Sequence, residues 1–287
     1  MTYIGRFAPS PSGRLHLGSA TIAIASYLRA KQQYGKIILR IEDLDKTRCS
    51  FENTKAIFKE LDSLGLKYDE IFIQSEHDKD YLYVINKLLQ QEIAYICKCS
   101  RKEIQKRPCP CKDKHFKAEG HYSIRFPLSY KRTNFNDTIL GNINLDRKLD
   151  SIILKRADDM ISYNLACCYD DIRENITEIV RGADLLYATF MQFDLLDTLN
   201  YQKKNLPSYL HIPLVLDENN NKYSKQNHAK AIFDSYSVND IIKLCLTHLN
   251  QDTSYITKNK SSKEIILKAI DNFDISKIGT TNRQIIY

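Results

Sequence analysis

The first hundred residues alternate short apolar runs with longer segments whose apolar residues recur three or four positions apart. The short runs are typical of strands, and the longer periodic segments are typical of helices ended by Gly35 and Gly65. The strand-like runs cover residues 3–8, 36–43 and 71–75. The helix-like segments cover residues 15–34, 51–64 and 80–93. This alternation predicts a parallel sheet with crossover helices, in which ligands bind beyond the carboxyl ends of the strands.

The alternation stops after the third helix and resumes near residue 151. The intervening segment holds four cysteines, many charges and short strand-like pieces, which predicts a small domain inserted into the sheet. An asparagine-rich loop lies at 217–228, and the remainder reads as helical, with Ser261 and Glu264 as a capping box. We therefore expect an α/β protein. Its sheet domain would comprise residues 1–96 and 151–216, its inserted domain residues 97–150, and its loop and helical C-terminal region residues 217–287.

Composition indicates a folded protein that does not cross a membrane. The chain is 43% hydrophobic and 27% charged, and it has no run of about 18 apolar residues that could span a bilayer. The N-terminus lacks the basic and apolar segments of a secretory signal, so we expect a cytoplasmic protein. We also expect a monomer. A net charge of +7 suits an RNA or nucleotide partner, although many ordinary enzymes carry a similar charge.

The inserted segment contains the sequence CKCSRKEIQKRPCPC, in which two Cys-x-Cys pairs are separated by nine residues. Four thiolates in one short window suit a tetrahedral, structural Zn²⁺ and favour a metal over disulfides in an intracellular chain. The Cys-x-Cys spacing is less usual than Cys-x-x-Cys, and reduced free cysteines are the alternative. The predicted ligands are Cys97, Cys99, Cys109 and Cys111, with His115, His121 and Tyr122 as substitutes for the third and fourth.

The sequence RFAPSPSGRLHLGS at residues 6–19 places a loop of proline, serine and glycine between a strand and a helix start. A helix N-terminus offers N–H groups and a partial positive charge, and Gly13 and Gly18 allow a phosphate to approach the backbone. His16 could donate to a phosphate oxygen. The loop matches neither the Walker nor the GxGxxG pattern, and a structural turn with a satisfied histidine is an equal alternative.

A second polar segment, NKYSKQNHA at residues 221–229, follows a strand and carries lysines on both sides of Ser224. Alone it would be read as a solvated basic loop. Together, the two segments resemble the two signatures of class I aminoacyl-tRNA synthetases. HLGS (residues 16–19) stands for the HIGH motif, and KYSKQ (residues 222–226) stands for KMSKS.

The order of further motifs narrows this resemblance. The segments LRIEDLDKTR, YNLACCYDD, TEIVRGADLL and HIPLVL resemble the glutamyl-tRNA synthetase group over residues 3–230. The forms HLGS and SKQN, with the chain length, resemble its shortened paralogues, the glutamyl-queuosine tRNA(Asp) synthetases. The resemblance implies a Rossmann-type catalytic core with an inserted zinc-binding domain. Since about 60 residues follow the ATP loop, we expect no anticodon-binding domain of ordinary size.

The resemblance also implies a reaction and the residues that perform it. L-Glutamate would be activated by ATP, with Mg²⁺, to glutamyl-adenylate and then transferred to the queuosine base in the anticodon of tRNA(Asp). The implied catalytic residues are His16 and Lys225. The implied glutamate-binding residues are Arg6, Ala8, Ser10, Glu42, Tyr163 and Arg181. The implied ATP-binding residues are Pro9, Gly13, His16, Gly18, Ser19, Lys222, Ser224 and Lys225.

The implied glutamate site matches what the ligand needs chemically. Arg6 and Arg181 suit its carboxylates, because a guanidinium binds a carboxylate with two parallel hydrogen bonds. Glu42, at the end of a strand, suits the ammonium group. Asp43 and Asp45 are expected to hold loops or to pair with Arg48, and whether Ser19 contacts ATP is left open.

Three other functions are compatible with the sequence. One is a short glutamyl-tRNA synthetase that charges the 3′ end of tRNA(Glu). Another is a non-catalytic, synthetase-like RNA-binding protein, against which the intact ATP and glutamate residues argue. The third is another nucleotide-binding α/β enzyme, such as an adenylyltransferase, which the arginines and the zinc insertion disfavour.

Overall fold

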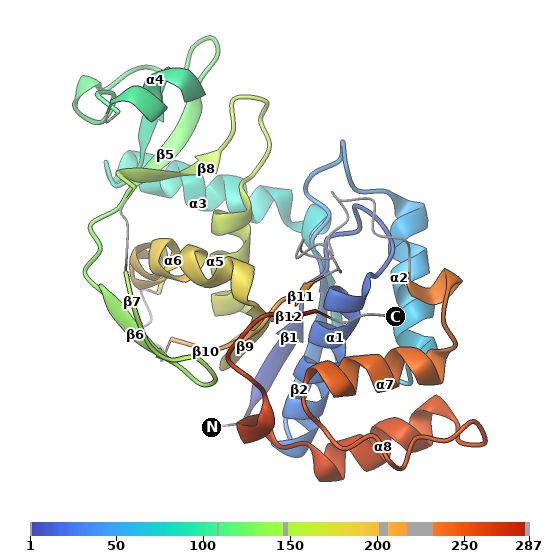
Figure 1. Cartoon of the computed structure of the whole chain (residues 1–287). Helices are drawn as coiled ribbons and strands as arrows, with labels where there is room; N and C mark the ends of the chain where they lie inside the picture. The colour runs from blue at the N-terminus through green and yellow to red at the C-terminus, as the bar shows by residue number, and fades with distance from the viewer. Residues whose placement is uncertain (1, 108, 146–148, 201–205, 217–231, 285–287) are drawn as a thin grey trace.

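The computed structural model describes residues 2–107, 109–145, 149–200, 206–216 and 232–284 (Figure 1). The predicted parallel sheet is present, with strands in the order β1-β2-β3. Its strands are β1 (Ile4–Phe7), β2 (Lys36–Ile41) and β3 (Glu70–Ile73). Its crossover helices are α1 (Leu17–Gln32) and α2 (Phe51–Ser63), and the Ser50 side chain caps α2 as its sequence suggests.

A second parallel pair extends this layer of strands. β9 (Glu178–Gly182) and β10 (Ser208–Ile212) run parallel to each other. The N–H of Thr177, just before β9, donates to the carbonyl of Ile4 at 2.9 Å, so β9 lies beside β1. The carboxyl ends of β1, β2 and β9 consequently face the same edge of the molecule, as the sequence pattern predicted.

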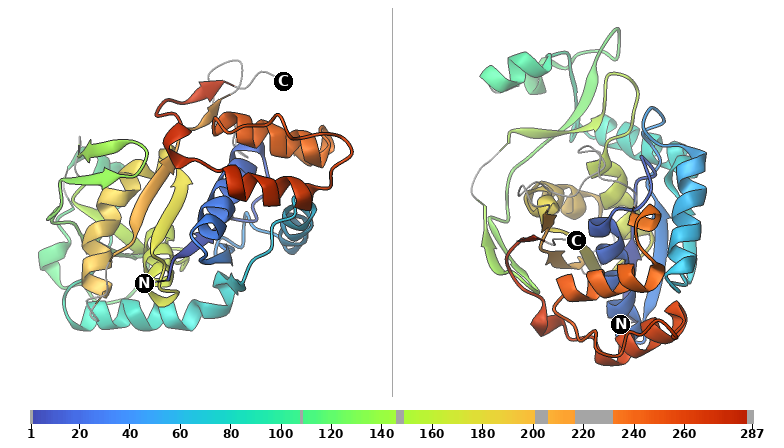
Figure 2. Two further views of the ribbon diagram at one scale, coloured as in Figure 1. Left: turned by 90° about the horizontal axis from the view of Figure 1, so that it is seen from below. Right: turned by 45° about the vertical axis from the view of Figure 1, so that its right-hand side comes forward.

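The C-terminal helices cover α1. They are α7 (Val238–His248) and α8 (Ser262–Asn272), and the predicted capping box of Ser261 and Glu264 is formed. Their buried faces share one apolar core with α1, β1 and β2, and the views of Figure 2 show the two helices side by side against α1. β12 (Arg283–Gln284) returns to pair with β11 (Val215–Leu216), which ties this region to the end of β10.

An antiparallel sheet in the order β4-β5-β8 joins β5 of the inserted segment to a strand at each end of that segment. Its strands are β4 (Tyr95–Cys97), β5 (Ser123–Pro127) and β8 (Ser151–Lys155). Helix α3 (Asp78–Gln90) precedes β4 in the chain. Helix α4 (Arg101–Lys106) lies at the end of the molecule opposite to α8 (Figure 1). The strand predicted near 151 exists, but it pairs antiparallel with β5, whereas the resumed alternation predicted a strand of the parallel sheet.

A hairpin of the same segment packs on the main body of the protein. It consists of β6 (Asn134–Asp137) and β7 (Gly141–Asn144). The N–H of Thr138 donates to the carbonyl of Tyr209 in β10 at 2.9 Å, and the Phe135 ring lies 5.7 Å from the Tyr209 ring. Part of the segment between 97 and 150 is therefore joined to β10, while the domain boundaries themselves stay predictions.

Two helices lie between the parallel strands and the antiparallel sheet of β4, β5 and β8 (Figure 1). They are α5 (Tyr163–Arg173), which the Ser162 side chain caps, and α6 (Leu186–Leu199). Short 3₁₀ helices cover Gln74–His77, Lys112–Lys114, Ala183–Leu185, Ile232–Asp234 and Ile275–Lys277. Within the described ranges, no helix has both the length and the apolar character needed to cross a membrane.

Candidate active site

A cleft of about 620 Å³ lies between the parallel strands and the inserted sheet. On one side it is lined by Ser10 after β1 and by Glu42 after β2, and Tyr163 at the start of α5 also faces it. The opposite side includes Arg125 of β5 and Ser151 of β8. Three of the six residues expected to bind glutamate thus share one cleft, at the carboxyl ends of the strands.

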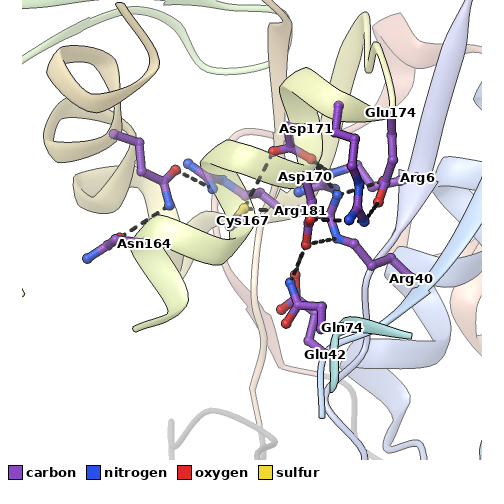
Figure 3. Close-up of polar contacts among 12 residues, drawn as sticks. Arg6, Arg40, Glu42, Gln74, Asn164, Cys167, Asp170, Asp171, Glu174 and Arg181 are labelled. Carbon is purple, nitrogen blue, oxygen red and sulfur yellow. Dashed lines mark hydrogen bonds and ion pairs between the residues drawn. The ribbon is translucent and has the colours of Figure 1, made fainter. Parts of the chain in front are cut away.

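Arg6 is buried in β1, and Figure 3 shows it among the acidic side chains of α5. Its Nε donates to the Oδ1 of Asp171 at 3.2 Å, and its Nη1 donates to the carbonyl of Val180 at 3.0 Å. These contacts join β1 to α5 and β9. The guanidinium is held in a fixed orientation before any ligand binds.

A second buried arginine, Arg40 of β2, lies among carboxylates and has no solvent exposure. Its Nη1 lies 2.9 Å from Asp171 and 2.8 Å from Glu174, and its Nη2 lies 3.5 Å from Glu42. Asp170 is also part of this group, 3.9 Å from the Arg40 Nε. Figure 3 shows the carboxylates of α5 gathered around the two arginines.

Burial in this group favours a proton on Glu42. Burial raises the pKa of Glu42 to about 7, even though Arg40 and Arg6 lower it and only partly offset the burial. Burial also raises the pKa of Asp171, but Arg40 and Arg6 outweigh it and hold that pKa below its ordinary value. A cation placed next to Glu42 would favour the ionised carboxylate and replace the proton.

Arg181 of β9 is anchored by three side chains. Its Nε bonds to the Nε2 of His211 at 3.1 Å, its Nη1 to Gln192 at 2.9 Å and its Nη2 to Thr189 at 2.6 Å. Gln192 in turn donates to Asn164, which lines the cleft. A guanidinium has five N–H donors, so these three bonds leave two with which Arg181 can bind a carboxylate.

The side chains of His16 and Ser19 cap the start of α1. The Nδ1 of His16 accepts from the Ser19 N–H at 3.3 Å, while the Ser19 hydroxyl accepts from the His16 N–H at 2.9 Å. Because Nδ1 is the acceptor, a neutral His16 ring carries its proton on Nε2. The hydroxyl of Ser19 also donates to the His16 carbonyl at 2.8 Å, which gives this residue a capping role.

A smaller cavity of about 110 Å³ lies against this helix start. Its lining includes His16, Gly18 and Ser19 on one side and Gly182 and Asp184 after β9 on the other. Three of the residues expected to bind ATP therefore share a cavity adjoining the end of β9.

The remaining predicted residues lie around these cavities or outside the described residues. Ala8, Pro9 and Gly13 belong to the loop between β1 and α1, and within the described part of the chain they line neither cavity. Lys222, Ser224 and Lys225 lie outside the described residues. Asp43 accepts from the N–H and hydroxyl of Ser75, and Asp45 lies 3.9 Å from Arg48, so both hold loops as predicted.

The four cysteines of the inserted segment form a compact cluster. Their sulfur atoms all lie within 4.8 Å of one another, and the pairs Cys97–Cys109 and Cys99–Cys111 are each 3.4 Å apart. Four sulfurs about 2.3 Å from one Zn²⁺ would be about 3.8 Å apart in a tetrahedron, so the donor set fits the metal. Among the described residues the cluster includes no histidine, so His115 and His121 are not needed as ligands.

Several residues of the site were missed by the sequence analysis. They are Arg40, Asp137, Asp170, Asp171, Glu174 and His211. Arg40 carried a usable signal, because a charge inside the apolar strand sequence KIILRI requires buried partners. Asp170 and Asp171, which follow an apolar run in α5, are the matching signal, because two acids in a largely apolar helix can pair with a buried arginine.

Comparisons with known proteins agree with this architecture. The family described as "tRNA synthetases class I (E and Q), catalytic domain" matches residues 4–109 and 109–268. A glutamyl-Q tRNA(Asp) synthetase of Pectobacterium atrosepticum is 39% identical over 87% of this chain and 78% of its own length. That of Photorhabdus laumondii is 36% identical over 96% of this chain and 88% of its own length.

Among solved structures, a glutamate tRNA ligase from Elizabethkingia meningosepticum in complex with its amino acid superposes with a TM-score of 0.79. The two sequences are 24% identical, and the match covers 99% of this chain and 67% of that one. At this identity, the likeness establishes the fold.

Proposed function

This chain belongs to the class I tRNA synthetases for glutamate and glutamine, in the group of glutamyl-Q tRNA(Asp) synthetases, and we propose that it activates L-glutamate with ATP and transfers it to queuosine in the anticodon of tRNA(Asp). Attachment of glutamate to tRNA is the activity that its relatives support. The use of ATP, the queuosine acceptor and the roles of individual residues are the proposed part.

One observation carries the proposal. One buried acid, Glu42, lines the cleft together with Ser10 and Tyr163. Two buried, preoriented arginines, Arg6 and Arg181, do not line it but lie within electrostatic reach of Tyr163. Glutamate carries two carboxylates and one ammonium group, so its charges are matched one for one. The orientation of both guanidiniums is fixed by neighbouring side chains, which reduces the entropy lost when the ligand binds.

In the first step, an oxygen of the glutamate α-carboxylate would attack the α-phosphorus of ATP. The bond from that phosphorus to the bridging oxygen breaks, and pyrophosphate leaves with the electron pair. The N–H groups at the start of α1 and the Nε2–H of His16 would donate to phosphate oxygens, and Lys225 would add a positive charge. Mg²⁺ bound to the phosphates would offset the charge on the leaving pyrophosphate.

In the second step, a hydroxyl of the queuosine cyclopentene ring would attack the carbonyl carbon of the adenylate. An ester forms, AMP leaves with the bonding electrons, and the hydroxyl proton passes to a phosphate oxygen or to water. The cleft of about 620 Å³ extends past Glu42 and Tyr163 to β5 and β8, so it has room for more than a free amino acid. That extra room supports a bulky acceptor.

The proposal is tested in two stages. Exchange of labelled pyrophosphate into ATP should depend on glutamate, proceed without RNA, and fail with glutamine or aspartate. Labelled glutamate should then be transferred to tRNA(Asp) that contains queuosine and not to tRNA(Asp) from cells unable to make queuosine. Label on tRNA(Glu), or label that is indifferent to queuosine, would refute the proposed acceptor. Absence of glutamate-dependent exchange would refute the activation step.

A further inference from the structure

A buried pair, Asp137 and His211, contacts Arg181 through the histidine ring. The Nδ1 of His211 lies 2.7 Å from the Oδ2 of Asp137, and the Nε2 of the same ring lies 3.1 Å from the Arg181 Nε. The side chains of His211 and Asp137 have no solvent exposure. The acid comes from the end of β6, the histidine from β10 and the arginine from β9, so three segments distant in sequence meet here.

The proton positions in this row are determined by chemistry. Arginine nitrogens only donate, so the Nε2 of His211 must be the acceptor and carry no proton. A neutral His211 therefore has its proton on Nδ1 and donates it to Asp137. Burial lowers the pKa of His211 even though the bond to Asp137 raises it, which agrees with a neutral ring. Every hydrogen bond then runs in one direction, from arginine to histidine to aspartate.

Asp137 is itself fixed by the backbone. Its Oδ1 accepts from the N–H groups of Ile139 and Leu140 at 3.0 and 2.9 Å. Its Oδ2 accepts from the backbone N–H of His211 at 3.1 Å, besides the ring. The carboxylate therefore cannot rotate without losing these bonds.

We propose that Asp137 and His211 are positioning residues, which hold the guanidinium of Arg181 at the orientation that binds a carboxylate of glutamate. The inference rests on the proposed function, because it takes Arg181 to be a glutamate ligand. Thr189 and Gln192 hold the two terminal nitrogens of Arg181 from α6, and His211 holds Nε from β10, with its Nε2 3.3 Å from the Thr189 hydroxyl. Without the histidine as an acceptor, the guanidinium would keep its charge and lose its fixed plane.

Asp137→Asn tests the pair without changing its size. The Oδ1 position keeps an oxygen that accepts from Ile139 and Leu140, so the new amide nitrogen takes the Oδ2 position. There it donates to the Nδ1 of His211 and loses the bond that Oδ2 accepts from the His211 backbone N–H. His211 must then carry its proton on Nε2, where it meets the Nε–H of Arg181. Two donors facing each other should raise the KM for glutamate about ten- to a hundredfold, the range of a lost hydrogen bond to a charged group. The KM for ATP should stay within about twofold.

Asp194→Asn is the matched control. Asp194 is also a buried carboxylate that holds the inserted segment, through the N–H groups of Ser129 and Tyr130 at 2.6 and 2.7 Å. Among the described residues, the hydrogen bonds of its carboxylate go to Ser129, Tyr130 and Lys131 and not to His211 or Arg181. If Asp137 were only a structural anchor, both variants would lose stability and neither would change the KM for glutamate selectively.

Nuclear magnetic resonance of ¹⁵N-labelled histidine gives a readout that does not require a variant to fold. Wild-type His211 should show a protonated Nδ1 and an unprotonated Nε2, and Asp137→Asn should exchange the two. A wild-type ring protonated on Nε2, or a glutamate KM equal in the two variants, would overturn the inference. A wild-type protein without glutamate-dependent exchange would instead refute the proposed function, and with it the ligand assigned to Arg181.

Discussion

Replacing Glu42 by glutamine should make the unliganded protein more stable at pH 8 and poorer at binding glutamate. The side chain of Glu42 is 8% exposed and lies near Asp170 and Asp171 of α5, and it shares Arg40 with Glu174 just after that helix. Burial is the main cause of the raised pKa of Glu42, and Arg40 and Arg6 only partly offset it. A neutral amide of the same shape removes one buried charge and keeps the packing.

The magnitude follows from the pKa. The rise from 4.5 to about 7 corresponds to a penalty of about 3 kcal/mol on the ionised form in the folded chain. Below pH 4.5 the carboxyl is protonated in both the folded and the unfolded chain, and the penalty is absent. As the pH rises from 4.5 to 7, the unfolded chain loses the proton first, so stability falls and the full penalty applies above pH 7. Glu42→Gln should therefore gain about 3 kcal/mol at pH 8 and under about 1 kcal/mol at pH 5.

Urea unfolding of both proteins at pH 5 and pH 8 measures this difference. Glu60→Gln is the control, because Glu60 is a buried carboxylate in a close pair with Arg14 (2.6 Å) and it also accepts the Leu15 N–H at 2.9 Å. That variant breaks a pair and should be less stable than wild type at pH 8. If Glu42→Gln is no more stable than wild type at pH 8, or gains equally at both pH values, the charge account of this group is wrong.

Four further predictions follow from the site. The KM for glutamate should fall as the pH rises toward about 7 and then level off, because ionised Glu42 is the form that binds an ammonium group. In Glu42→Gln the KM for glutamate should be high at every pH. A wild-type KM that does not depend on pH would contradict this prediction. Metal analysis should find one zinc per chain, lost in Cys97→Ser and retained in Cys49→Ser; retention in both would exclude the cluster as the site. Ser19→Ala should cost about 1 kcal/mol in urea unfolding, since it removes the capping-box bond that the Ser19 hydroxyl accepts from the His16 N–H, and leave the KM for ATP within about twofold. A large rise in that KM at unchanged stability would place Ser19 at the nucleotide. Lys225→Ala should lower the rate of pyrophosphate exchange tenfold or more without raising the KM for glutamate, and an equal effect on both would argue against a phosphate contact.

The sheet and its helices could be predicted because their signals are local. Apolar runs alternate with helical periodicity from Ile4 to Ile73, and glycine or serine marks the helix ends, so β1, β2, β3, α1 and α2 lie where the pattern puts them. The pairing of β8 with β5 had no such signal, because alternation along one strand says nothing about its partner. The hairpin of β6 and β7 packs on β10 through aromatic side chains whose contacts also have no local signature.

The candidate site divides in the same way. The spacing of the cysteines was enough to predict the cluster of four sulfurs. The ends of the predicted strands were enough to place Ser10 and Glu42 at one edge of the sheet. The buried partners that orient the arginines could not be found from the sequence, since Asp137 and His211 are 74 residues apart and become neighbours only through the fold. A buried charge such as Arg40 shows that partners must exist without identifying which acids supply them.

The position of the transferred label tests the central claim most directly. tRNA(Asp) that contains queuosine and has lost its 3′-terminal adenosine should be incubated with labelled glutamate, ATP and the protein, then digested to nucleosides. The account predicts that the label elutes with the modified nucleoside of the anticodon and disappears when queuosine is absent. Label found only on tRNA with an intact 3′ end would contradict it and identify the chain as an enzyme that charges the 3′ terminus.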